Sequence, residues 1–259
     1  IIGGGPAGMA AAISAKRSNS KLDVVLIEKN EIMGRKLRAT GNGRCNITNV
    51  NAEGFSEVTS FLSSLGIVTK TNDNGFLYPV SESAADVSEL LELRLKQLGV
   101  KVYTGVTALE VSYASDKTEF VTSVSMGDAS SQCKSANALK CTVYSSALVI
   151  AVGGKSAPVY GSTGEGYRWL RGLGHTVTRL VPSLAPIECD GADLSKLSGT
   201  RVRAEAKLFK NGEEIHREDG EIQFTKFGLS GICIFNLSKM MRFEPGDTFS
   251  NFEIELDLC

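Results

Sequence analysis

The stretch that decides the fold is residues 1–28, IIGGGPAGMAAAISAKRSNSKLDVVLIE. Two isoleucines lead into a glycine-rich turn, and small residues suited to a helix follow from Met9 to Arg17. Val24 to Ile27 then form a short apolar run typical of a buried strand. Strand, turn, helix and strand in this order predict a βαβ unit with parallel strands.

The turn has the spacing Gly3-x-Gly5-x-x-Gly8, and Glu28 follows 20 residues after Gly8. In dinucleotide-binding βαβ units the three glycines allow, in turn, a tight bend, approach of a pyrophosphate, and close packing of helix on strand, while the acidic residue bonds a ribose hydroxyl. The helix N-terminus adds free N–H groups and a partial positive charge. The alternative is a turn that serves packing alone, but the complete βαβ context favours nucleotide binding.

Composition restricts the class of protein. The 259 residues allow one large domain or two ordinary ones, and the net charge of −1 gives no sign of a nucleic-acid or membrane partner. The chain has no run of about 18 apolar residues, which is what a membrane-spanning helix needs. Six cysteines without a C-x-x-C pair, and only two histidines, argue against a metal site and favour reduced thiols in a cytoplasmic protein.

Further along the chain, periodicity predicts the remaining elements of a first domain. Residues 33–50 are glycine-rich and polar, so we expect a long loop there. A helix is expected to begin after a capping box formed by Ser83 and Asp86 and to end at Gly99. The other expected elements are strands at 100–103 and 108–111, a hairpin or loop excursion over 113–138, and a buried strand at 147–152.

After about His175 the pattern changes to alternation with period two. Residues 201–208 alternate charged and apolar side chains, Asn211-Gly212 is typical of a type I′ hairpin turn, and residues 252–258 alternate again. We therefore expect a Rossmann-type α/β domain over 1–178, followed by a partial β-rich domain over 179–259. The chain begins and ends inside predicted strands, so we interpret it as a fragment.

Residues 34–49 carry a second glycine-rich segment, GRKLRATGNGRCNITN. Glycines expose backbone N–H groups, Asn and Thr supply neutral donors and acceptors, and Arg35, Lys36 and Arg44 supply positive charge. Such a segment suits a pyrophosphate and the polar edge of an isoalloxazine ring. The alternative is a solvated loop. A redox-active Cys45 beside the flavin is considered as well, but without a partner cysteine nearby in the sequence we interpret Cys45 as a structural thiol.

This segment resembles the signature of the BaiN-like flavoproteins, also called the aminoacetone oxidase family of FAD-binding enzymes. Four further strings agree in the order of that family: GFLYPVS at 75–81, AVGG at 151–154, GSTGEGY at 161–167 and FGLSG at 227–231. Val152 stands where the family usually has Thr, and Ile232 where it usually has Pro. The resemblance covers residues 1 to about 240, and the glycine-rich C-terminal segment of the family lies outside this chain.

The resemblance implies a Rossmann-type FAD/NAD(P)-binding domain with an inserted, mostly antiparallel β domain. It implies an FAD-dependent oxidoreductase that transfers a hydride between a small organic substrate and the flavin, with O2 or NAD(P) as the second partner. Val106 is expected at the adenine. The full set of expected FAD contacts is Gly3, Gly5, Pro6, Ala7, Gly8, Glu28, Lys29, Arg35, Lys36, Thr40, Gly41, Asn42, Gly43, Arg44, Cys45, Asn46, Val106, Ala151, Gly153 and Gly154.

Several alternatives stay open at this point, and no catalytic residue can be named. The protein could be a reductase of an unsaturated or steroid-like substrate, a non-catalytic FAD-binding module, or a flavoprotein that assists RNA modification, although the charge balance speaks mildly against RNA. A plain NAD-binding domain is disfavoured by residues 34–49. Tyr167 and Trp169 are interpreted as packing against the sheet and not as stacking on the flavin.

Overall fold

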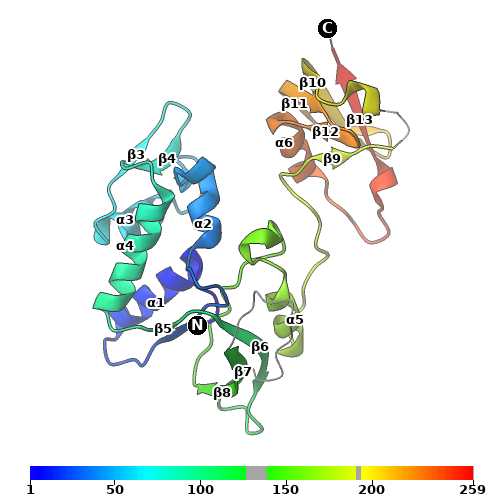
Figure 1. Cartoon of the computed structure of the whole chain (residues 1–259). Helices are drawn as coiled ribbons and strands as arrows, with labels where there is room; N and C mark the ends of the chain where they lie inside the picture. Colours follow the sequence, from blue (N-terminus) through cyan, green and yellow to red (C-terminus); the bar gives the residue numbers. More distant parts are fainter. Residues whose placement is uncertain (127–138, 191–193, 259) are drawn as a thin grey trace. The chain divides into compact units, whose positions relative to one another are not determined.

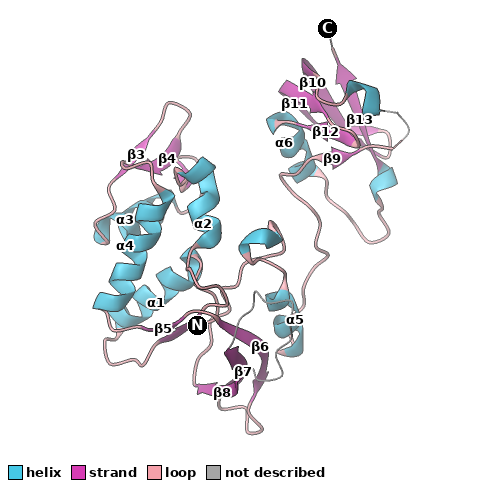
Figure 2. Ribbon diagram, viewed as in Figure 1, coloured by secondary structure: helices cyan, strands magenta, loops and turns pink. Residues whose placement is uncertain are grey.

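The structure is a computed structural model that describes residues 1–126, 139–190 and 194–258. The chain divides into two compact units, Ile1–Val177 and Thr178–Cys259, and each is described by itself (Figure 1 and Figure 2). The part of the predicted excursion beyond residue 126 lies outside the described residues.

The first unit is built on a short parallel sheet. β1 (Val25–Ile27) pairs in parallel with β5 (Lys101–Tyr103). Ile2 forms parallel bridges to Ile27 on one side and to Ile150 on the other. The predicted βαβ unit is therefore present, and the strand order runs from β5 through β1 and the Ile2 segment to the Ile150 segment.

Two helices cover this sheet with apolar side chains. α1 (Pro6–Ser18) begins with a proline at its first position, which suits a helix start, and buries Met9, Ala12 and Ile13. α4 (Ala84–Gln97) begins after Ser83, whose Oγ accepts a hydrogen bond from the Asp86 backbone N–H at 3.2 Å, as the capping box predicted. Both helices contribute to the largest core cluster of the unit.

The prediction of a loop over residues 33–50 is wrong. The segment forms α2 (Arg35–Ala39), the 3₁₀ helix η1 (Thr40–Gly43) and the two-residue strand β2 (Thr48–Asn49). Gly34 has φ of 67°, which lets the chain turn sharply into α2, and Leu37 packs against the core cluster. Glycine content predicted a loop, but here the glycines mark the ends of short helices.

The same part of the chain contains further short elements. α3 (Phe55–Ser64) buries Leu62 and was not predicted. β2 pairs with β4 (Phe76–Pro79), which pairs with β3 (Thr69–Thr71), so that the three strands form an antiparallel sheet in the order β2-β4-β3.

A second antiparallel sheet lies beside the parallel one and contains β6 (Val106–Tyr113), β7 (Phe120–Met126) and β8 (Leu139–Ser145). The 3₁₀ helix η2 (Pro158–Tyr160) precedes α5 (Glu165–Gly172), whose Trp169 is buried and donates from Nε1 to the Leu109 carbonyl at 3.3 Å. The prediction of a buried strand at 147–152 is wrong: only Ile150 makes a bridge, and Val149 is 41% exposed. The described residues pair this segment on its Ile2 side alone, so it lies at an edge.

The second unit is a mostly antiparallel β domain, as predicted. In its described residues, five strands follow the order β13-β10-β11-β12-β9, and α6 (Ile232–Met240) packs against their apolar side chains. Asn211 and Gly212 have φ of 53° and 84°, which confirms the predicted hairpin turn. The remaining bounds are β9 (Ile187–Glu188), η3 (Leu194–Leu197), β10 (Arg201–Lys210), β11 (Glu213–Phe224), β12 (Gly228–Ser230), η4 (Phe249–Asn251) and β13 (Phe252–Asp257).

Candidate functional site

The first unit contains a cavity of about 460 Å³ at the carboxyl ends of its parallel strands. This edge is where open α/β sheets bind ligands, and the volume falls within the usual range for small-molecule sites. Segments far apart in sequence meet in its wall. The predicted site residues that line it are Gly3, Gly5, Pro6, Ala7, Glu28, Lys29, Arg35, Lys36, Val106, Ala151 and Gly153.

The three glycines of the first turn have different surroundings. A β-carbon on Gly3, whose φ is 107°, would meet the backbone of Ala151, and one on Gly8 would collide with the Gly3 carbonyl. A β-carbon on Gly5 would meet nothing within 4 Å, and Gly5 lines the cavity. Gly3 and Gly8 are therefore needed by the fold, whereas the space above Gly5 is open to a ligand.

The N-terminus of α1 faces this space with unpaired backbone groups. No described side chain caps the helix, and Pro6 at its first position has no N–H. The first N–H groups of a helix have no partner within the helix, so those of Ala7 and Gly8 are available to an anion. The arrangement suits the pyrophosphate of a dinucleotide.

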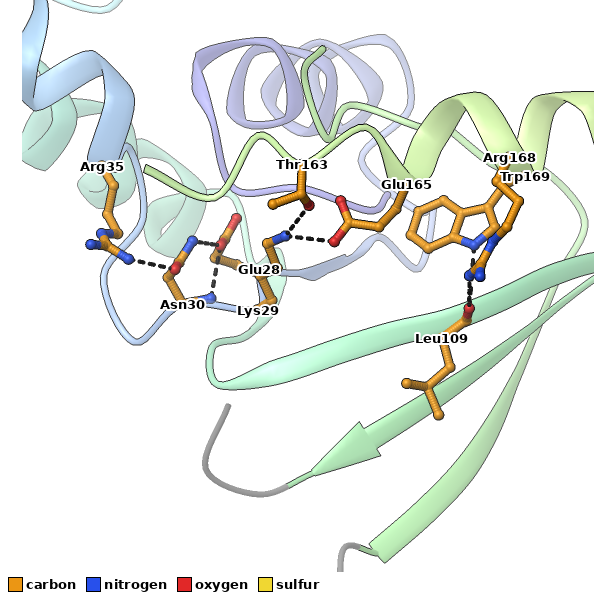
Figure 3. Close-up of polar contacts among 9 residues, drawn as sticks. All are labelled: Glu28, Lys29, Asn30, Arg35, Leu109, Thr163, Glu165, Arg168 and Trp169. Atoms are coloured by element: carbon orange, nitrogen blue, oxygen red, sulfur yellow. Dashed lines mark hydrogen bonds and ion pairs between the residues drawn. The ribbon is translucent and has the colours of Figure 1, made fainter. Parts of the chain in front are cut away.

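Glu28 follows β1 and is 8% exposed (Figure 3). Its Oε2 accepts from the Gly4 N–H at 2.6 Å, and its Oε1 accepts from the Asn30 N–H at 2.8 Å and from the Asn30 side-chain amide. A carboxylate offers about four acceptor sites, so it can still accept from a hydroxyl in the cavity. The Glu28 carbonyl accepts from the Val106 N–H at 3.0 Å, so that N–H is not free for the adenine that was predicted there.

Lys29 joins the end of β1 to the segment before α5. Its Nζ lies 2.9 Å from Glu165 Oε1 and 3.2 Å from Thr163 Oγ1 (Figure 3). Burial on its own raises the pKa of Glu165, but hydrogen bonds from Thr163 and Lys29 outweigh it and leave that pKa below its ordinary value. The pair therefore holds one wall of the cavity in place without adding net charge.

Two other cations of the wall, Arg35 and Lys36, make no ion pair with a residue that the structure describes. Arg35 donates to Asn30 Oδ1 at 2.8 Å, and Lys36 donates to the Ser156 carbonyl at 2.9 Å and to Ser156 Oγ at 3.3 Å. Among the residues that the structure describes, these partners are all neutral. The cavity therefore presents positive charge beside the α1 N-terminus, which favours an anionic ligand.

The second glycine-rich turn lies elsewhere. The Arg44 guanidinium stands 5.3 Å from the centre of the Tyr78 ring, and Gly41 packs against Asn46 and the same tyrosine. Cys45 is buried; burial raises the pKa of its thiol and a hydrogen bond with Thr40 lowers it less, which favours a structural thiol. The predicted site residues outside the cavity wall are Gly8, Thr40, Gly41, Asn42, Gly43, Arg44, Cys45, Asn46 and Gly154, and their contact with a cofactor stays a prediction.

The cavity also contains residues that the sequence analysis did not select. Asn30, Tyr160 and Ser162 line it, as do Glu165 and Trp169. The string at 161–167 was a usable signal for Ser162 and Glu165, because it already resembled a family motif. Asn30 and Tyr160 follow no motif or periodicity that would have marked them.

Two features that the described residues lack bear on the class of site. In the described parts of the chain, no helix has both the length and the apolar character that crossing a membrane requires. Over the same residues, no cluster of three or more His, Cys, Asp or Glu side chains could hold a metal ion.

A family model and two proteins of known name match this chain. A family model described as "HI0933-like protein Rossmann domain" matches residues 1–59 and 54–221. The 3-dehydro-bile acid delta(4,6)-reductase of Clostridium scindens is 35% identical over 260 residues, which cover 92% of this chain and 59% of that protein. The ribosomal RNA dihydrouridine synthase of Haemophilus influenzae is 27% identical over 282 residues, which cover 100% of this chain and 63% of that protein.

The chain therefore spans 59% to 63% of the length of these two relatives. Among solved structures, a flavoprotein/dehydrogenase from Cytophaga hutchinsonii is similar with a TM-score of 0.38 and 13% identity, over 81% of this chain and 45% of that chain. This structural likeness is too distant to carry an argument.

Proposed function

The chain belongs to the HI0933-like protein family, as the resemblance of its motifs predicted, and we propose that it forms the FAD-binding part of an FAD-dependent oxidoreductase. The observation that carries the proposal is the convergence, in one cavity wall, of an open glycine, an uncapped helix N-terminus and two cations whose described hydrogen-bond partners are neutral. Each of these features favours an anion, and Glu28 beside them offers an acceptor for a ribose hydroxyl.

The residues present fit FAD. Gly5 and Ala7 would hold the pyrophosphate against the helix N-terminus, with Arg35 and Lys36 supplying charge. Glu28 would accept from the ribose of the adenosine half, and a carboxylate at that place disfavours the 2′-phosphate of NADP. The apolar side chains of Ile2, Ile27 and Ile150 would exclude water from the deeper part of the cavity.

FAD, when bound, supplies the redox chemistry by taking up or giving up a hydride. This chain's own part is to bind and orient. The Lys29–Glu165 ion pair keeps the wall before α5 in place, and the positive charge of Arg35 and Lys36 lowers the energy of negative charge in the cavity.

We further propose that the protein acts in the reductive direction on a small unsaturated molecule, with NADH or NADPH as the electron donor. One relative is named a reductase of a 3-dehydro-bile acid, at 35% identity. The second candidate is RNA modification, which is supported by the relative named a ribosomal RNA dihydrouridine synthase, at 27% identity. The net charge of −1 favours the small molecule.

The test is titration of the purified full-length protein with FAD, followed by anaerobic addition of NADH or NADPH. We expect saturable binding and bleaching of the flavin absorbance, and then recovery of the absorbance when an α,β-unsaturated ketone is added. Recovery with uridine-containing RNA instead would favour the second candidate. No bleaching would favour an oxidase reduced by its own substrate, and failure to take up FAD at all would overturn the proposal.

A further inference from the structure

Asn30 lies between Glu28 and Arg35 and bonds both side chains (Figure 3). Its Nδ2 donates to Glu28 Oε1, and its Oδ1 accepts from Arg35 at 2.8 Å. Its backbone N–H donates to the same Glu28 oxygen at 2.8 Å. One asparagine therefore connects the acidic and the basic residue of the cavity wall.

The orientation of this amide is set from both ends. A carboxylate can only accept and a guanidinium can only donate, so the amide NH2 must face Glu28 and the amide oxygen must face Arg35. Gly161, with φ of 103°, lies so close that its β-carbon would stand 3.0 Å from Asn30 Nδ2. The half-buried side chain is therefore contacted by Glu28 after β1, by Arg35 of α2 and by Gly161 before α5.

The fixed amide of Asn30 restricts the orientation of the Glu28 carboxylate. The terminal torsion of a glutamate is broad, and a carboxylate held by one donor can rotate. Gly4 fixes one oxygen of Glu28, and the two donors of Asn30 fix the other. Without the side chain of Asn30, Glu28 keeps one backbone donor on each oxygen, but Oε1 loses its second donor and the carboxylate loses its link to Arg35, so its orientation toward the cavity is held less firmly.

We propose that Asn30 is a positioning residue that holds the Glu28 carboxylate in the orientation that recognises the 2′-hydroxyl of the adenosine ribose of FAD. Asn30 thereby determines how strongly the site discriminates between FAD and a dinucleotide that lacks this hydroxyl. The inference rests on the proposed FAD site and adds to it a residue that acts through Glu28.

The experiment compares two ligands on the full-length protein: FAD, and the FAD analogue whose adenosine ribose carries no 2′-hydroxyl. Dissociation constants are measured for the wild type, Asn30→Ala, Asn30→Ser, Glu28→Ala and the double variant Glu28→Ala/Asn30→Ala. The matched control is Asn72→Ala, because the Asn72 side chain also takes part in two hydrogen bonds, both accepted by its Oδ1 from the Asn74 and Phe76 N–H groups, in a turn outside the cavity wall.

We expect the wild type to bind FAD about tenfold more tightly than the analogue, which is the size expected for one hydrogen bond to a charged group. In Asn30→Ala and Asn30→Ser this preference should fall to about twofold or less, while Asn72→Ala keeps it. The double variant should lose no more than Glu28→Ala alone, because residues that act through one contact are not additive. A merely structural asparagine would lower the affinity for both ligands alike and would leave the preference unchanged.

The outcomes separate the two proposals. If the wild type does not bind FAD, the proposed function fails and the inference fails with it. If the wild type binds FAD and Asn30→Ala keeps the tenfold preference, the inference alone is overturned. The inference is also overturned if the wild type binds both ligands equally, or if the losses of Glu28→Ala and Asn30→Ala multiply in the double variant.

Discussion

Two glycine-rich turns in the first unit have similar compositions and different surroundings. The turn at residues 3–8 follows the central segment of the parallel sheet and lines the cavity, whereas the turn at residues 40–45 connects α2 to β2 and packs against Tyr78. Both were predicted to contact FAD. A glycine-rich composition therefore indicates that a segment is able to bind phosphate. Whether the segment lines a given cavity depends on where it lies relative to the parallel sheet.

The largest expected effect is on folding, from Gly8→Val in the first turn. A β-carbon at Gly8 would collide with the Gly3 carbonyl, so helix and strand must separate, and we expect a loss of about 3 kcal/mol or more in the free energy of unfolding. Chemical denaturation measures it. Stability equal to that of the wild type would show that this turn is not packed as described.

The next effect is on binding, from Gly5→Val in the same turn. Gly5 has φ of −76° and ψ of 177°, which valine adopts easily, and its β-carbon enters open space. We expect a loss of stability of about 1 kcal/mol at most, because valine is a poorer N-cap than glycine, and about a hundredfold weaker FAD binding, because the side chain fills the place of the pyrophosphate. Gly172→Ala, which adds a β-carbon in open space outside the cavity wall, is the control and should bind FAD normally. If Gly5→Val binds FAD as tightly as the wild type, the turn at residues 3–8 does not contact the pyrophosphate.

Gly5 and Gly8 also show how much of the site could be predicted from the sequence. The spacing of the first turn, together with the strand before it and Glu28 after it, was enough to predict the fold and the expected place of the pyrophosphate. Asn30 could not be predicted, because its role depends on contacts with Arg35 and Gly161 that form only in the folded chain. A single sequence contains no signal for such a contact.

The errors in the fold have physical causes of the same kind. Residues 33–50 were predicted as a loop because glycine disfavours helix interiors, yet Gly34 and Gly41, with φ of 67° and 58°, permit the sharp turns at which short helices begin and end. The apolar run at 147–152 predicted a buried strand, but burial depends on partners on both sides. The hairpin at Asn211 was predictable because its turn type follows from two adjacent residues.

The comparison of the two turns extends to the cations near each of them: Arg35 and Lys36 of α2, which line the cavity, and Arg44 in the second turn. Arg35→Gln combined with Lys36→Gln should weaken FAD binding about tenfold at low salt and by less at high salt, because the lost attraction is screened. Arg44→Gln should cost about 0.5–1 kcal/mol of stability through its lost contact with Tyr78, and should weaken FAD binding less than the double variant because Arg44 lies outside the cavity wall. Isothermal titration at two salt concentrations measures both. A loss of FAD affinity in Arg44→Gln as large as in the Arg35→Gln/Lys36→Gln variant would indicate that the second turn contacts the cofactor.

The smallest expected effect concerns the wall before α5. The pKa of Glu165 is lowered in the folded state, so the ionised carboxylate contributes stability above its ordinary pKa, and this contribution is lost as the pH falls through the folded value. Glu165→Gln should therefore cost about 0.5 kcal/mol near neutral pH, as for a partly exposed ion pair, and flatten the acid side of the stability profile. If the dependence of stability on pH is unchanged by the substitution, the ion pair of Glu165 with Lys29 does not contribute to stability as described.

The most direct test of the central claim uses Trp169, the single tryptophan of the chain, which is 4% exposed and lines the cavity. Its fluorescence is recorded while FAD is titrated into the wild type and into Gly5→Val. The account predicts saturable quenching in the wild type and a titration shifted to about hundredfold higher FAD in Gly5→Val. Quenching that is equal in both proteins, or absent from the wild type, would contradict the assignment of this cavity as the FAD site.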